Sequence, residues 1–212
     1  MSRIIFHVDV NSAFLSWEAV HRIQDLGEEL DLRTIPSAVG GDISKRHGVI
    51  LAKSTPAKQF HVQTGEPILR ALQKCPNLVL VAPNHTLYAQ YSKKLHTMLY
   101  EYTPVIEPFS IDEAFLDMSN VCMNYNEAIE TANSMKERIK RELGFTVNIG
   151  ISTNKLLAKM ASDFKKPDLV HTLFPEEIPT KMWPLPLSEL YFVGRATSKT
   201  LYGLGLKTIG DI

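Results

Sequence analysis

The stretch FSIDEAFLD, Phe109 to Asp117, lies at the centre of the predicted fold. Two adjacent acids, Asp112 and Glu113, stand between two short apolar runs, which is typical of a β-hairpin tip. One interpretation is an ordinary polar turn, since acidic residues are common there. The other is a metal site, because neighbouring carboxylates repel one another unless cations lie between them. A metal site requires a further carboxylate from elsewhere in the chain.

The segments around this hairpin predict an α+β fold. Strands are expected where apolar residues alternate or form short runs, at residues 3–10, 105–111, 114–118, 145–151 and 169–174. Helices are expected where apolar residues recur at steps of three and four, at residues 84–102, 124–143 and 153–164. This order contains a ferredoxin-like βαββαβ unit. We expect its helices to cover one face of an antiparallel sheet and to leave the other face open.

Two further parts interrupt or follow this unit. Residues 13–83 form an insertion that begins with a helix and carries strand-like runs at 48–52 and 77–82. Residues 175–186 contain four prolines and are interpreted as a linker. A small helical piece, residues 187–212, comes after it.

Composition limits the possible classes of function. Lys plus Arg equals Asp plus Glu at 23 each in 212 residues, so overall charge does not favour nucleic acid or an anionic membrane. The two cysteines, Cys75 and Cys122, have no metal-ligand spacing and are interpreted as reduced thiols of a cytoplasmic protein. No leader or membrane-spanning run is found. Because the chain ends within LKTIGDI, we expect it to be a piece of a longer protein.

Asp9 is the candidate for the third carboxylate. It stands at the end of the first predicted strand, which lies beside the hairpin in a βαββαβ unit. Mg²⁺ takes oxygen ligands, and two such ions can clamp an in-line phosphoryl displacement. Spacing alone favours the simpler interpretation, a strand-end residue and a solvated turn. A Walker-type phosphate loop is absent from the sequence, so an ATPase has no support.

Several motifs together favour the metal site over the solvated turn. HVDVNSAF (His7 to Phe14) and FSIDEAFLD resemble the two acidic motifs of the Y-family, or translesion, DNA polymerases, also called the ImpB/MucB/SamB group. HVQTGEP (61–67) is similar to the finger-loop segment of that family, and NIGISTNKLLAKMASDFKKP (148–167) to its palm helix and phosphate-lysine segment. FVGRATSKTLYGLGLKTIGDI (192–212) resembles the helix-hairpin-helix start of its thumb.

The resemblance implies a division into domains and a reaction. Residues 1–12 and 84–174 would form the catalytic palm, 13–83 the fingers and 175–212 a partial thumb, without the C-terminal little-finger domain. The reaction would be template-directed addition of dNTPs to a primer 3′-OH during DNA damage tolerance. Two Mg²⁺ ions would be held by Asp9, Asp112, Glu113 and the backbone carbonyl of Val10.

The resemblance also implies a nucleotide site. Its residues would be Asn11, Ser12, Ala13 and Phe14 at the start of a helix, together with Thr55, Lys58 and Lys166. Phe14 would be the steric gate that rejects a ribose 2′-OH; the alternative is an ordinary core aromatic residue. Thr55 and Lys58 depart from the family, because many members carry Tyr and Arg there, and lysine lacks the bidentate fork of arginine. Asn11 is more similar to the polymerase V branch than to the polymerase IV branch, and we leave the branch open.

Two stretches carry positive charge suited to a triphosphate. Residues 43–70, including Lys45 and Arg46, have a formal charge of +4, and residues 155–166 have +3. A solvated surface is the alternative for each lysine, and it is preferred for Lys155 and Lys165.

The resemblance extends to partners. Gly194 and Arg195 would contact a DNA phosphate at the hairpin of the thumb; the alternative is a generic helical hairpin. We expect a monomer that binds primer-template DNA weakly, with a sliding clamp as a candidate partner through the absent C-terminal part. The rival functions are a palm-fold nucleotidyl cyclase and a catalytically idle DNA-binding module.

Overall fold

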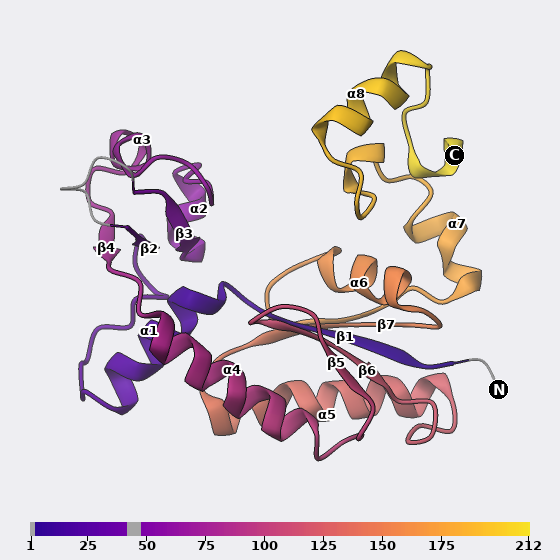
Figure 1. Cartoon of the computed structure of the whole chain (residues 1–212), viewed down its shortest axis with the longest axis horizontal. Helices are drawn as coiled ribbons and strands as arrows, with labels where there is room; N and C mark the ends of the chain where they lie inside the picture. The colour runs from indigo at the N-terminus through magenta and orange to yellow at the C-terminus, as the bar shows by residue number, and fades with distance from the viewer. Residues whose placement is uncertain (1–2, 42–47) are drawn as a thin grey trace.

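The computed structural model describes residues 3–41 and 48–212. Its main sheet has the strand order β5-β6-β1-β7-β8 (Figure 1). These strands are β1 (Ile5–Val10), β5 (Ile106–Pro108), β6 (Glu113–Asp117), β7 (Val147–Ser152) and β8 (Val170–Thr172). Central β1 is antiparallel to β6 and β7, and β8 is parallel to β7. The order β7-β1-β6-β5 is that of a βαββαβ unit, so the predicted fold class is confirmed.

Helices cover both faces of this sheet. The predicted helices α4 (His85–Leu99) and α5 (Tyr125–Leu143) lie on one face, where Phe6 and Val8 join the main core. α6 (Lys155–Asp163) lies on the opposite face over β1 and β7 (Figure 1). There Ala158 packs against Ile5 and Phe115. The expectation of an open face was therefore wrong for the part that α6 covers.

Gly150 explains how α6 comes so close to β7. A Cβ atom at this position would lie 1.9 Å from the carbonyl oxygen of Ala158 and 2.5 Å from the amide nitrogen of Ser162. Both are backbone atoms, which a rotamer change cannot move aside. The absence of a side chain at Gly150 therefore sets the distance between helix and sheet.

We expect Gly150→Ala to lower the free energy of unfolding by about 3 kcal/mol, because it overpacks a contact with backbone atoms. Urea unfolding would measure the change. Gly203→Ala is the matched control, since a Cβ atom there meets nothing within 4 Å. A Gly150→Ala protein as stable as the control would contradict this account of the close approach.

A second, three-stranded sheet forms in the insertion. Its order is β3-β2-β4, with β2 at Ser37–Gly40, β3 at Ile50–Lys53 and β4 at Val79–Val81. β3 and β4 agree with predicted strands, whereas β2 was missed because SAVG is too short to show a pattern. The short helices α2 (Thr55–Gln59) and α3 (Ile68–Lys74) pack beside this sheet around their own core. α1 (Ala13–Gln24) instead buries Trp17 in the main core.

The C-terminal region is more ordered than predicted. The expected linker contains a 3-10 turn, η2 (Pro175–Glu177), and a short helix, α7 (Ile178–Lys181). Pro175 and Pro179 stand in the first turns of these helices, where proline is tolerated because no intrahelical N–H bond is lost. Met182 packs with Leu157 and Met160 of α6, so this segment is attached to the main body.

The remaining elements are η3 (Leu187–Glu189), α8 (Arg195–Gly203) and η4 (Ile209–Asp211). α8 ends at Gly203, and Gly205 follows with a φ of +88°, a left-handed conformation that suits glycine. Among the described residues, none of the helices combines the length and apolar character needed to span a membrane.

Candidate active site

The predicted acidic residues meet where β1 ends and β6 begins. Asp9 is the direct cross-strand partner of Glu113, and the amide of Val10 donates to the carbonyl oxygen of Asp112 at 3.1 Å. The structure thus brings the first strand beside the hairpin as expected. Glu113 is the first residue of β6 rather than part of the turn, whereas Asp112 remains in the turn and is half-buried.

Each of the three carboxylates has its own partner. Lys166 Nζ lies 2.8 Å from Asp9 Oδ2, and Lys159 Nζ lies 2.7 Å from Glu113 Oε2. The hydroxyl of Ser110 donates to Asp112 Oδ1 at 2.7 Å. In the described residues, 3–41 and 48–212, no three acidic, histidine or cysteine side chains converge as a ready metal cage. Lysine ammonium groups therefore balance much of the acidic charge.

Burial and ion pairing act in opposite directions on these acids. Burial raises the pKa of Asp9 above its ordinary value, and the nearby Lys166 ammonium only partly offsets this effect. Burial also acts to raise the pKa of Glu113, but hydrogen bonds from His7 and Lys159 lower it to about 2. Asp9 is the more deeply buried of the two. The loss of hydration therefore affects its pKa more than its ion pair with Lys166 does.

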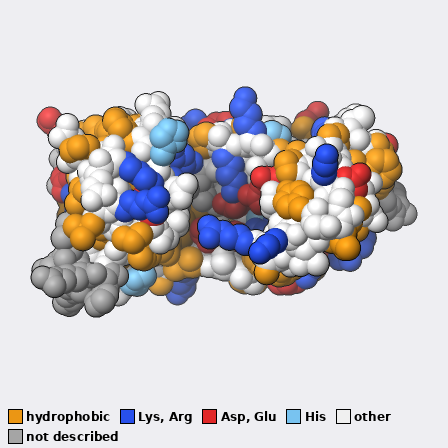
Figure 2. Space-filling model, turned by 90° about the horizontal axis from the view of Figure 1, so that it is seen from above, with side chains coloured by type: hydrophobic (Ala, Val, Ile, Leu, Met, Phe, Trp, Pro, Cys, Tyr) orange, Lys and Arg blue, Asp and Glu red, His pale blue; other side chains and the backbone are white. Residues whose placement is uncertain are grey.

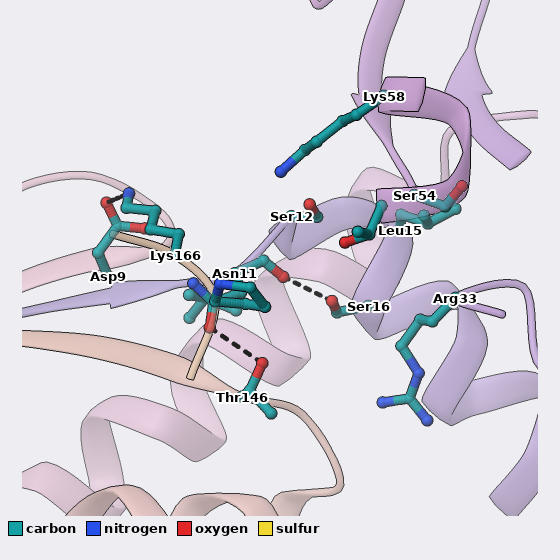
Figure 3. A pocket seen from close by; sticks show the side chains of 13 residues that line it. Asp9, Asn11, Ser12, Leu15, Ser16, Arg33, Ser54, Lys58, Thr146 and Lys166 are labelled. Carbon is teal, nitrogen blue, oxygen red and sulfur yellow. Dashed lines mark hydrogen bonds and ion pairs between the residues drawn. The ribbon is translucent and has the colours of Figure 1, made fainter. Parts of the chain in front are cut away.

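Two adjoining cavities open beside these carboxylates. One, of about 330 Å³, is lined by Asp9, Asp112, Glu113 and Phe14 among others. The other, of about 190 Å³, continues toward Arg33 and Thr146, and both share Lys58 and Lys166. Seen from above, Lys, Arg and acidic side chains gather in a hollow between the insertion and the C-terminal piece (Figure 2). Lys58 extends from α2 into this space (Figure 3).

The start of α1 forms one wall of the cavities. Ser12 has a left-handed backbone with a φ of 49°, and α1 begins without a side-chain cap, so its first N–H groups remain available. The Asn11 side chain is turned inward, where its oxygen accepts from Thr146 Oγ1 at 3.0 Å (Figure 3). Its amide donates to Asn148 at 3.1 Å. The side chain of Asn11 is thus held in place from both sides, by Thr146 and by Asn148.

Phe14 is held by an aromatic stack. The centroid of its ring lies 4.5 Å from that of Tyr88, at an interplanar angle of 11°. The His85 ring packs edge-on against it, with a centroid distance of 5.9 Å. The ring is half-buried and lines the larger cavity. Such packing leaves the ring little freedom to move aside.

The loop that carries Lys166 is tied to both strands and helices. The buried Asn148 donates its amide to the carbonyl oxygens of Ser162 at 3.0 Å and Lys165 at 2.6 Å. The amide of Asp168 donates to the Asn11 side chain at 2.9 Å. These hydrogen bonds fix the loop in the conformation that places Lys166 against Asp9.

Asp168 anchors the same loop to α5. Its carboxylate lies 2.9 Å from the ammonium groups of both Lys136 and Lys140. Although partial burial acts to raise its pKa, hydrogen bonds from these two lysines lower the pKa of Asp168 below its ordinary value. The ionised form therefore stabilises the folded chain.

We expect Asp168→Asn to lower the free energy of unfolding at pH 7 by about 1–2 kcal/mol. This value lies between the typical contribution of an exposed ion pair and the cost of breaking a buried one. Asparagine tolerates the φ of 62° at this position, so the change mainly removes charge. Because the folded pKa is lowered, this stabilisation is present above the unfolded pKa of about 3.9 and is lost as pH falls through the folded value. Urea unfolding between pH 7 and pH 3 should show the two proteins converging at the acidic end; a constant difference would contradict this.

Sequence reasoning missed several residues of the site. His7 is fully buried between Ser162 and Glu113, with its Nε2 3.2 Å from Glu113 Oε2. Its position two residues before Asp9, on the same face of a strand, was an available signal. The position of Arg33, which forms an ion pair with Asp31, could not be predicted from the sequence because it depends on tertiary packing. Lys45 and Arg46 lie outside the described residues.

The DNA-contact candidates lie apart from the cavities. Gly194 is the N-cap of α8 and Arg195 its first residue, and both are exposed. A Cβ atom at Gly194 would meet nothing within 4 Å, so the approach to this helix end is open. The geometry leaves the first N–H groups of α8 facing solvent.

Comparisons with known proteins show the family of the chain. The model of the impB/mucB/samB family matches residues 8–163, and that of the IMS family HHH motif matches residues 175–206. The chain belongs to the impB/mucB/samB family. DNA polymerase IV of Clostridium acetobutylicum is 52% identical over 212 residues, covering 100% of this chain and 53% of that protein. DNA polymerase IV 1 of Bacillus subtilis is 40% identical, covering 100% and 49%.

The family assignment is supported by solved structures. DinB from Sulfolobus solfataricus superposes with a TM-score of 0.85 at 29% identity, over 98% of this chain and 59% of that one. An insertion ternary complex of Dbh DNA polymerase gives 0.87 at 28% identity, with the same coverage. The chain spans about half the length of the curated relatives it matches. Both curated relatives named above are DNA polymerase IV proteins.

Proposed function

We propose that this chain carries the active site of a translesion DNA polymerase, which adds dNTPs to a primer 3′-OH under the direction of a template. The observation that supports it is one cavity with an acidic wall at Asp9, Asp112 and Glu113, and a cationic wall at Lys58 and Lys166. Such a cavity suits a substrate that brings both metal ions and phosphates. The proposal is also supported by the structural similarity of this chain to Dbh DNA polymerase, which has been solved as an insertion ternary complex.

The acidic wall fits two Mg²⁺ ions. Carboxylate and carbonyl oxygens are the ligands this hard cation prefers, and Asp9, Asp112, Glu113 and Val10 bring them to one cavity. The ammonium groups next to Asp9 and Glu113 indicate that positive charge is favoured there. When bound, the ions would supply activation of the 3′-OH and neutralisation of phosphate charge.

The cationic wall would bind the triphosphate. Lys58 reaches into the cavity from α2, with Thr55 on the same helix, and Lys166 stands at the opposite side (Figure 3). The uncapped N–H groups at the start of α1, near Ser12 and Ala13, would add hydrogen bonds to phosphate oxygens. The Phe14 ring would lie against the sugar. Catalysis would then consist mainly of positioning and charge neutralisation.

We propose the domain division that the family resemblance implies. Residues 1–12 and 84–174 would be the palm, 13–83 the fingers and 175–212 part of the thumb. Gly194 and Arg195, at an open helix end, would contact a DNA phosphate without reading sequence.

Two rival functions predict different products. A palm-fold nucleotidyl cyclase would share the acidic site but needs no template, and the thumb-like segment argues against it. An idle DNA-binding module would not need three acids at one cavity. Incubation with labelled nucleotide and no DNA would reveal a cyclic product if the cyclase reading were right.

Primer extension on a short primed template tests the proposal directly. With Mg²⁺ and dNTPs the 212-residue chain should lengthen the primer, and a chelator should abolish the activity. A full-length relative serves as positive control for the substrate. Failure of the chain together with success of the relative would refute activity in this chain, and a cyclic product would favour the cyclase.

A further inference from the structure

Lys159 is a buried cation within the site that sequence reasoning did not single out. It lies on α6, and its side chain is only 8% exposed. Its ammonium donates to Glu113 Oε2 at 2.7 Å. A lysine this deeply buried is rare in proteins and needs compensating partners, so its placement requires an explanation beyond a solvated surface charge.

Two aromatic rings from separate segments supply further compensation. Lys159 Nζ lies 5.5 Å from the ring centroid of Phe109 and 5.0 Å from that of Tyr191. The two rings contact each other edge to face at 6.4 Å. Ring faces attract a cation, and more strongly where water is excluded. Phe109 and Tyr191 thus hold the ammonium at the carboxylate of Glu113.

The two rings belong to different parts of the fold. Phe109 precedes the acidic hairpin, whereas Tyr191 belongs to the C-terminal segment after η3. The amide of Tyr191 contacts Met160 Sδ at 3.3 Å, and Met160 shares a small core with Met182 and Ile209. One face of α6 therefore binds the C-terminal segment while Lys159 reaches the acidic site.

We propose that Lys159 is a positioning residue that couples the docking of the C-terminal segment, through Tyr191, to the availability of the Glu113 carboxylate. The inference rests on the proposed function, because it treats Glu113 as a cation ligand. While Tyr191 is docked, the ammonium occupies Glu113 and opposes a divalent cation there. Displacement of Tyr191 removes one ring from the ammonium, weakens its hold and releases the carboxylate.

The test uses Mn²⁺ as probe, with the 212-residue chain and no DNA or nucleotide. Free Mn²⁺ would be followed by electron paramagnetic resonance. Lys159→Met keeps the length and apolar stem but removes the charge, and should tighten Mn²⁺ binding roughly tenfold, because a nearby positive charge is lost. Lys159→Arg keeps the charge and should recover most of the wild-type affinity.

Tyr191 distinguishes coupling from a merely structural role. Tyr191→Leu should tighten Mn²⁺ binding roughly threefold, because the ring that holds the ammonium is lost. In the Lys159→Met background the same change should have no further effect, since Tyr191 acts through Lys159. Tyr100→Leu removes an exposed ring at the residue after α4 and controls for the loss of an aromatic side chain.

The possible results distinguish failure of the Lys159–Tyr191 coupling from failure of the proposed function. Mn²⁺ affinity unchanged in Lys159→Met, or a Tyr191→Leu effect that persists in the double variant, would overturn the coupling while leaving the metal site intact. Wild-type chain that neither binds Mn²⁺ nor extends a primer would instead refute the proposed function. Circular dichroism would establish that each variant is folded before its affinity is compared.

Discussion

The Asp112→Ala variant is expected to extend primers about 10³-fold more slowly than the unchanged chain, because a metal ligand supplies several kcal/mol of transition-state stabilisation. Asp112 suits this test because its side chain is half-buried in the hairpin turn and, among the described residues, forms a hydrogen bond only with its neighbour Ser110. Its loss should therefore leave the free energy of unfolding almost unchanged. Single-turnover primer extension and urea unfolding, measured side by side, separate the two effects.

Glu113→Ala should slow extension similarly but also destabilise the chain. It would leave Lys159 buried without its carboxylate, and an unpaired buried charge costs about 3 kcal/mol or more. Glu107→Gln is the matched control, because this neighbouring acid on β5 is exposed and forms only a surface ion pair with Lys155. Normal extension by Asp112→Ala, with the control equally active, would remove the acidic hairpin from the mechanism.

The second large effect is expected at Phe14. Phe14→Ala should reduce the preference for dNTPs over NTPs by about 10²-fold, because removing the ring makes room for a ribose 2′-OH. The ring would act as a barrier because it is stacked on the ring of Tyr88, which limits its movement. The ratio of kcat/KM for dNTP and NTP on the same template would measure the change.

Phe60→Ala controls for the loss of an aromatic side chain in the insertion. Phe60 is exposed just after α2 and does not line either cavity. Because Phe14 is half-buried, its truncation should cost about 1–3 kcal/mol of stability, less than for a fully buried ring. A folded Phe14→Ala protein with unchanged selectivity would return Phe14 to the alternative of an ordinary core aromatic residue.

Much of the main sheet was predictable because its signals are local. β1, β7 and the hairpin strands show apolar alternation or short apolar runs, and α4 and α5 show apolar steps of three and four. Asp9 could be placed beside Glu113 because the βαββαβ order puts the first strand next to the hairpin. Motif resemblance then named the nucleotide candidates, of which Phe14, Lys58 and Lys166 line one cavity.

Other features had no local signal. β2 has only four residues, and α7 stands in a proline-rich segment that would ordinarily be interpreted as a linker. The position of α6 on the second face depends on Gly150, whose importance appears only when a helix lies above it. The inward turn of Asn11 likewise depends on Thr146 and Asn148, which the sheet brings to it.

By itself, the sequence determined the βαββαβ order, the family and the three acids, because periodicity and motif spacing are properties of short segments. Only the tertiary structure decided which cation faces which acid. Lys166 at Asp9 and Lys159 at Glu113 are pairs between distant segments, joined by the docking of α6 and the loop after it. The interior side chains find their partners through packing and loss of water, and these arise only when the whole chain is folded.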